Sequence, residues 1–154
     1  MHLKKSTIED IHVFFEHQLD PESNQMAGFT AKDPTDKNAY ITKWTRLLSD
    51  PTIYLKTILV DDQIVGNIST WELEGEPQIS YWIDRPYWGK GYASQALTLF
   101  LAAFEQRPIY GRVAFDNYGS QRVLEKAGFK QVGKELFFAN ARGVEIEELV
   151  YRID

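Results

Sequence analysis

Residues 81–93 read Tyr81-Trp82-Ile83-Asp84-Arg85-Pro86-Tyr87-Trp88-Gly89-Lys90-Gly91-Tyr92-Ala93. This stretch predicts a strand, a loop with two glycines and an amphipathic helix that begins at once. Glycine permits backbone conformations that other residues resist, and it lets a chain approach a ligand closely. The first N–H groups of a helix point outward at the positive end of its dipole. The loop is therefore suited to holding a pyrophosphate, with positive charge from Lys90 nearby.

Two common nucleotide-binding motifs do not match this loop. A Walker loop has Ser or Thr directly after Gly-Lys, where this chain has Gly91. A dinucleotide-binding loop has a third glycine where this chain has Ser94. Taken alone, Gly89 and Gly91 are equally consistent with an ordinary turn.

Length and composition predict one globular domain over residues 1–154. The net charge of −5 leaves no basic stripe of the kind that nucleic-acid binders need, so we expect no nucleic-acid partner. The chain has no cysteine, which excludes disulfides, Cys-ligated metals and a thiol nucleophile. His12 and His17 do not share a helix face, and we expect no metal site.

The sequence shows no segment suited to a membrane. The first ten residues, MHLKKSTIED, lack the apolar core of a secretory signal. The longest apolar run, Ala96 to Phe104, is much shorter than the roughly 18 to 20 residues of a bilayer span. We therefore expect a cytoplasmic protein with no membrane partner.

Hydrophobic periodicity and turn residues predict the element order β-α-α-β-β-β-α-β-α-β-β. The expected strands are 3–5, 53–60, 64–71, 78–83, 109–115, 130–138 and 144–153, and three of the expected helices are 36–48, 91–104 and 117–127. The first helix is expected after Ser6 and Glu9, which stand in capping-box spacing. Segment 20–34 is expected to be a loop and 72–77 a turn. The pattern predicts an α+β fold, a mixed sheet with helices packed on it.

A second motif, Asn117 to Phe129, reads NYGSQRVLEKAGF. With the first, it resembles the motifs of the GCN5-related N-acetyltransferase (GNAT) family. That family's acetyl-CoA-binding pattern is Q/R-x-x-G-x-G/A, whose three positions are here Trp88, Gly91 and Ala93. The second motif is similar to the family's N-x-x-S-x-x-V-x-x-K-x-G-F helix. Trp in place of Gln or Arg resembles the branch of ribosomal-protein N-terminal acetyltransferases, the RimJ/RimL-like proteins.

The resemblance implies the GNAT fold: a mixed, mostly antiparallel sheet of about seven strands, helices on both faces, and a V-shaped splay between the fourth and fifth strands. Acetyl-CoA is the implied co-substrate. Its pantetheine arm would pair with the backbone of residues 80–83, and its pyrophosphate would lie on the N–H groups of residues 88–93. The implied cofactor-binding residues are Tyr81, Trp82, Ile83, Trp88, Gly89, Lys90, Gly91, Tyr92, Ala93 and Asn117. Asn117 could equally serve only as a helix N-cap.

The resemblance is less complete for the catalytic residues. Many members place a Tyr as general acid seven residues after the Asn, where this chain has Leu124. The ribosomal branch implies the Ser three after the Asn, so Ser120 is expected to donate a hydrogen bond to the CoA sulfur. A Glu found in that branch is replaced by Ala139. Among the carboxylates of the 72–77 turn we take Glu76 as the candidate general base.

We therefore expect an N-acetyltransferase that transfers an acetyl group directly from acetyl-CoA to a primary amine. The acceptor is either a protein N-terminus or a small molecule, contacted by residues 20–48 and 140–143. The alternative is a non-catalytic module that binds or senses acyl-CoA, which Leu124 and Ala139 keep open. The oligomeric state, a homodimer included, is left open.

Overall fold

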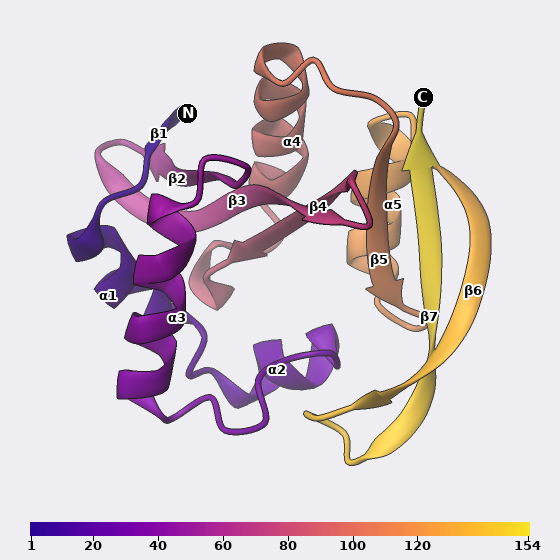
Figure 1. Ribbon diagram of the computed structural model, residues 1–154, viewed down its shortest axis with the longest axis horizontal. Helices are drawn as coiled ribbons and strands as arrows, with labels where there is room; N and C mark the ends of the chain where they lie inside the picture. Colours follow the sequence, from indigo (N-terminus) through magenta and orange to yellow (C-terminus); the bar gives the residue numbers. More distant parts are fainter.

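A computed structural model describes residues 1–154. Its seven strands form one sheet in the order β1-β2-β3-β4-β5-β7-β6 (Figure 1). The strands are β1 (His2–Lys5), β2 (Tyr54–Val60), β3 (Gln63–Leu73), β4 (Glu76–Ile83), β5 (Ile109–Ala114), β6 (Lys130–Ala139) and β7 (Val144–Ile153). All neighbours pair antiparallel except β4 and β5, which pair parallel. The predicted fold class is confirmed.

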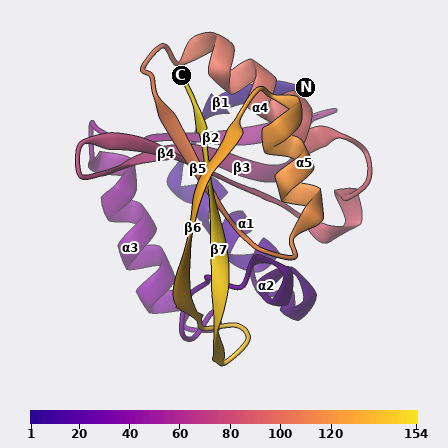
Figure 2. The same cartoon turned by 90° about the vertical axis from the view of Figure 1, so that its right-hand side faces the viewer.

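Helices cover both faces of the sheet (Figure 2). They are α1 (Ile8–His17), α2 (Pro21–Ala27), α3 (Lys37–Ser49), α4 (Tyr92–Ala103) and α5 (Tyr118–Lys126), with a 3₁₀ turn at Arg85–Tyr87. Helices α1 and α3 lie on one face, and α4 and α5 lie on the other. No helix is long and apolar enough to cross a membrane.

The core is divided by the sheet, as strand alternation requires. On β2, Leu55 packs towards α1 and α3, whereas Ile58 packs into the larger cluster beneath α4 and α5. On β3, Ile64 and Val65 are divided in the same way. Strands β2 and β3 therefore pack against helices on both faces of the sheet.

Strands β4 and β5 separate soon after they meet. Their parallel pairing consists of two residue pairs, Gln78 with Tyr110 and Ile79 with Gly111. Beyond these pairs β4 turns away, so that in Figure 1 β4 runs from side to side whereas β5 runs from top to bottom. The peptide groups that follow Ile79 consequently lose their partners on one side, which is the V-shaped splay expected from the resemblance.

Three local predictions were wrong. Segment 20–34 contains helix α2, whose N-cap Asp20 accepts from Ser23 N–H and is followed by Pro21. The capping box of α1 is formed by Thr7 and Asp10, one residue beyond the predicted pair.

Ser6 is not a cap because its hydroxyl lies 2.8 Å from that of Thr57 on β2. The expected 72–77 turn is a two-residue hairpin loop at Glu74–Gly75, whose positive φ angles of 52° and 82° suit a tight turn. The strands on either side of this loop are longer than the turn residues suggested.

Candidate active site

Two cavities meet at the open end of the splay. The first, here called the loop cleft, has a volume of about 600 Å³ and is lined by the end of β4, the loop before α4, the first turn of α4, the start of α5 and part of α2. The second, here called the sheet cavity, has a volume of about 530 Å³ and is lined by β3, β4, β5, β6, β7, α5 and residues 27–30. Five residues line both: Ala27, Tyr81, Trp82, Asn117 and Ser120. A ligand in each cavity would meet the other at these residues.

The loop cleft contains an uncapped helix N-terminus. Gly91 is the N-cap of α4, with a left-handed φ of 76°, and it offers no side chain to the helix. The first backbone bond of α4 joins Gln95 N–H to Gly91 O, so the N–H groups of residues 92–94 have no partner within the helix. Gly89 and Gly91 both have open space where a Cβ would stand. An anionic group would find free donors there.

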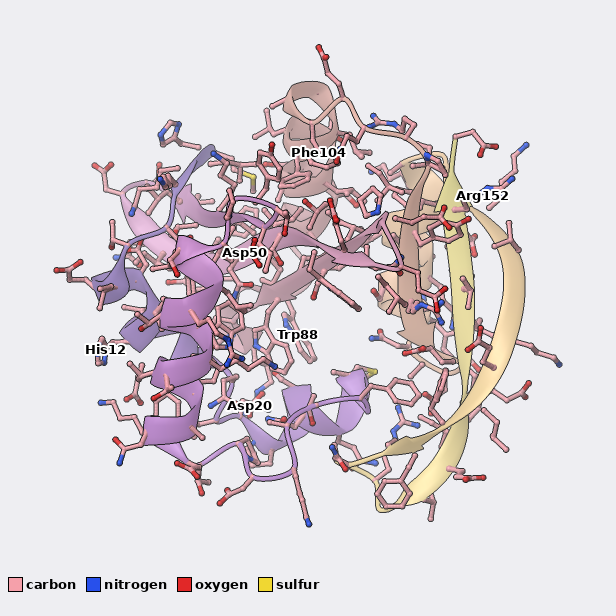
Figure 3. All side chains as sticks on the ribbon, in the orientation of Figure 1. His12, Asp20, Asp50, Trp88, Phe104 and Arg152 are labelled. Atoms are coloured by element: carbon pink, nitrogen blue, oxygen red, sulfur yellow. The ribbon has the colours of Figure 1, made fainter.

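Trp88 and Lys90 are placed differently from each other. The indole N–H of Trp88 donates to Ile83 O at 2.8 Å, and its backbone N–H donates to Arg85 O. Its side chain thus fastens the loop to the end of β4, and Figure 3 shows it at the centre of the molecule, between β4 and α2. Lys90 is exposed and does not line the cleft. The charged residue that lines it is Arg122 of α5, which the sequence analysis missed.

The free edge of β4 presents backbone groups to the splay. Asp84 N–H donates to Val65 O on β3 at 2.9 Å, and Trp82 O also faces β3, against Gly66. Because peptide groups alternate along a strand, those of Tyr81 and Ile83 face the opposite side. The carbonyl of Ile83 is taken by Trp88, which leaves the Tyr81 peptide groups and the Ile83 N–H towards the opening.

Asn117, Ser120 and Tyr81 form the junction of the cavities. Asn117 Oδ1 accepts from Ser120 N–H at 3.2 Å and so caps α5, while its side-chain N–H₂ group makes no hydrogen bond within the protein. Ser120 Oγ lies 2.8 Å from the Tyr81 hydroxyl. Burial raises the pKa of Tyr81 to about 12, so this hydroxyl stays protonated at neutral pH. It can donate to Ser120 while Ser120 donates onward.

Leu124 and Ala139 have structural roles at their positions. Leu124 is 1% exposed and packs so closely on Gly111 that a Cβ there would lie 2.9 Å from its methyl group. It fills the base of the splay between β4 and β5. Ala139 is fully buried and packs with Ala114 and Ile146. A carboxylate at this position would lie within an apolar cluster.

The structure gives no support to Glu76 as a general base. Glu76 is exposed at the start of β4 and lines neither cavity. The carboxylates that line the sheet cavity are Glu135 of β6 and Glu148 of β7, and its one basic residue is Arg112 of β5. The sequence contained a signal for Glu148, since it lies two residues from both Ile146 and Val150 and therefore shares the strand face on which these two side chains are buried.

The segment after α2 and the β6–β7 loop come together, although neither carries a sequence motif. Asn140 donates to Thr30 O at 2.8 Å, and Ala141 N–H donates to Gly28 O. Arg142 donates to Gln25 O and forms a two-pronged pair with Asp116. These contacts hold residues 27–30, which supply one wall of the sheet cavity.

Comparison with known proteins agrees with this geometry. The chain is 36% identical over 81 residues to "Probable N-acetyltransferase YjcK" of Bacillus subtilis, a match that covers 47% of this chain and 45% of that protein. It is 31% identical over 118 residues to "Putative ribosomal N-acetyltransferase YdaF" of Bacillus subtilis, covering 69% and 64% of the two chains. The matches thus span about half to two thirds of these relatives.

The fold is shared with a solved acetyltransferase. The microcin C7 self-immunity acetyltransferase MccE, determined in complex with acetyl-CoA and AMP, superposes with a TM-score of 0.81 at 13% identity, covering 98% of this chain and 90% of that one. Residues 1–130 match the family described as "Acetyltransferase (GNAT) domain". The chain belongs to the GNAT family of acetyltransferases.

Proposed function

We propose that this protein transfers an acetyl group from acetyl-CoA to a primary amine. The observation that carries the proposal is the junction of two separate cavities at Ser120, with an uncapped helix N-terminus in one of them. Such an arrangement lets two substrates enter from different sides and meet at one point. Family membership and the acetyl-CoA complex of MccE support the same co-substrate.

The loop cleft offers complementary groups to each part of acetyl-CoA. The free N–H groups of residues 92–94 suit a pyrophosphate, with Arg122 on the same cleft. The open peptide groups of Tyr81 and Ile83 suit the amides of a pantetheine arm, which would extend the sheet as an added strand. The side-chain N–H₂ of Asn117 is available to the same arm. The thioester would then lie at Ser120.

Direct transfer requires few protein groups. A neutral amine attacks the thioester carbonyl, and a backbone N–H of the free β4 edge stabilises the oxyanion. The C–S bond then breaks, and Ser120 donates a hydrogen bond to the departing thiolate. A CoA thiol ionises near pKa ~8.5, so the thiolate is already a fair leaving group. No acyl-thiol intermediate is available because the chain has no cysteine.

The competing function is a module that binds acyl-CoA without turnover. Leu124 and Ala139 favour it, since both stand where related enzymes carry ionisable groups. Calorimetric titration with acetyl-CoA, followed by a CoA-release assay over a broad panel of primary amines, separates the two functions. We expect binding together with amine-dependent release of CoA. Binding without release for any amine would establish the module, and the absence of binding would overturn both.

A further inference from the structure

Three charged side chains meet in the sheet cavity, and none of them lines the loop cleft. Arg112 of β5 lies 3.6 Å from Glu135 of β6 and 3.6 Å from Glu148 of β7. Arg112 Nε also donates to Gln78 Oε1 of β4 at 3.3 Å. Glu148 pairs across the sheet with Ala114, the last residue of β5. Glu148 therefore lies beside the carboxyl end of β5. From this end the chain continues into Asn117 and α5, which carry residues of the junction.

The charge of this cluster selects what can enter. Its one cation faces two carboxylates and an amide oxygen, so Arg112 has no free charge to offer an anionic ligand. No other charged side chain lines the cavity. The excess negative charge attracts an ammonium group and repels a carboxylate, and both effects are strong in a partly buried site.

Glu148 and Glu135 differ in exposure. The Glu148 side chain is 12% exposed and that of Glu135 is 50% exposed. Burial raises the pKa of Glu148, and the charge of Glu135 acts in the same direction, whereas Arg112 opposes them. A carboxylate with a raised pKa is a stronger base than one in water. Of the two carboxylates, Glu148 is therefore the better proton acceptor.

The remaining walls of the cavity are apolar and partly aromatic. Phe29 comes from the segment after α2, Trp71 and Leu73 come from β3, and Phe137 comes from β6. Three of these side chains, Trp71, Leu73 and Phe137, are at least 39% exposed. An apolar acceptor body would cover them and remove apolar area from water.

We propose that Glu148 receives the proton of the acceptor amine, and that the acceptor is a primary amine on an apolar, preferably aromatic body without a carboxylate beside the amine. This inference rests on the proposed acetyl transfer and names its acceptor class. The amine nitrogen bonds to the acetyl carbon as the C–S bond breaks. One N–H proton passes to Glu148, which then releases it to solvent, and the CoA thiolate takes up one proton from solvent, so the products are an amide and CoA thiol.

Three acceptors with one carbon skeleton test the specificity. Phenethylamine, phenylalaninamide and phenylalanine share the ring and differ only in the group beside the amine: hydrogen, a neutral amide or a carboxylate. Values of kcat/KM are compared per neutral amine, from full pH profiles, because the amines ionise at different pH. We expect phenylalanine to be at least tenfold poorer than the other two. Equal use of phenylalanine would overturn the assignment of the acceptor class.

Two variants on β7 test the role of Glu148. Glu148→Gln keeps the size of the side chain and removes the base, whereas Glu147→Gln alters an exposed neighbour that pairs with Lys134. We expect Glu148→Gln to lower kcat with phenylalaninamide about 100-fold or more. It should also abolish the acidic limb in the pH profile of kcat/KM per neutral amine, and it should leave the acetyl-CoA dissociation constant unchanged. Glu147→Gln should match the wild type in all three measurements.

The outcomes separate this inference from the proposed function. If the wild type acetylates other amines of the panel but neither phenethylamine nor phenylalaninamide, the acceptor class is wrong and the transfer activity stands. If Glu148→Gln keeps the acidic limb, the base is another group. If Glu148→Gln does not fold, the pH profile of the wild type tests the role of Glu148. A wild-type profile of kcat/KM per neutral amine without an acidic limb would overturn that role. If no amine is acetylated, the proposed function itself fails.

Discussion

The hydroxyl groups of Ser120 and Tyr81 lie 2.8 Å apart at the point where the two cavities meet. If Ser120 donates to the departing thiolate, Ser120→Ala should lower kcat about 10- to 100-fold, the low end of acid–base contributions. Acetyl-CoA affinity should stay nearly unchanged, because the substitution leaves the N-terminus of α4 and the loop before it untouched. Steady-state kinetics and calorimetry measure the two effects.

Tyr81→Phe is the matched comparison for this prediction. It removes the hydroxyl that faces Ser120 and leaves the Ser120 hydroxyl in place. A smaller loss of kcat than in Ser120→Ala would show that the serine is the group that acts on the sulfur. Full turnover in Ser120→Ala across pH would show that the thiolate leaves without its help.

The raised pKa of Glu148 also leads to a prediction about the stability of the protein. Because its pKa is raised in the folded protein, its favourable contribution is present below its ordinary pKa and is lost as pH rises through the raised value. Glu148→Gln should therefore be at least as stable as the wild type at pH 7, with a larger relative gain at pH 7 than at pH 4. Calorimetric melting at both pH values checks this. A loss of stability at pH 7 would mean that the pair with Arg112 outweighs the cost of burial.

At the scale of elements, the loop before α4 permits a controlled test of cofactor binding. Gly91 and Gly75 both have left-handed φ angles, 76° and 82°, and both have open space where a Cβ would stand. Alanine at either position costs about 1–2 kcal/mol of backbone strain. Only Gly91→Ala places a methyl group in the loop cleft, so it should weaken acetyl-CoA binding about tenfold, as expected for one lost charge-assisted hydrogen bond.

Gly75→Ala is the control, because this residue lies in the β3–β4 hairpin loop and lines neither cavity. Both variants should lose similar stability, and only Gly91→Ala should lose affinity in calorimetric titration. Equal affinities in two folded variants would remove the cofactor from this loop.

The contact between α2 and the β6–β7 hairpin is a second prediction at the scale of elements. The Arg142 side chain is 11% exposed, and it bonds Asp116 at 2.8 Å through two nitrogens and Gln25 O at 2.9 Å. These bonds hold the pKa of Asp116 below its ordinary value. Arg142→Ala should cost about 2 kcal/mol, in the range of hydrogen bonds to charged groups, and should raise KM for the amine.

The matched variant is Lys134→Ala on the same hairpin. Its pair with Glu147, at 3.2 Å, is exposed and should contribute less than about 1 kcal/mol. Denaturant unfolding measures the stability difference, and amine and acetyl-CoA titrations measure the two substrates separately. A similar loss in both variants would show that Arg142 does not hold the cavity wall specifically.

At the scale of the whole molecule, two cavities that share only five lining residues predict a sequential mechanism. If acetyl-CoA binds in the loop cleft and the amine in the sheet cavity, both can be bound together and meet at the five shared lining residues, Ala27, Tyr81, Trp82, Asn117 and Ser120. Initial rates varied in both substrates should give intersecting double-reciprocal lines. Parallel lines, or acetyl label retained on the protein after gel filtration, would contradict direct transfer.

The predictable parts of this protein depend on residues that are close in the chain. The left-handed turn at Gly91 and the cap at Asn117 each involve a few consecutive residues, so local sequence patterns revealed them. The roles of these residues in catalysis and binding stay predictions. Helix α2 was missed because Asp20 and Pro21, which begin it, are equally typical of loops.

Other features arise only when distant segments meet. Arg112, Glu135 and Glu148 lie on three strands, and the registers of β5 with β7 and of β6 with β7 bring them together. Likewise, the burial that raises the pKa of Glu148 comes from the assembled sheet. The glycine-containing loop before α4 could therefore be predicted from thirteen neighbouring residues, 81–93, whereas the charged cluster of the sheet cavity could not. Its charge and shape depend on strand pairing, which a local pattern does not specify.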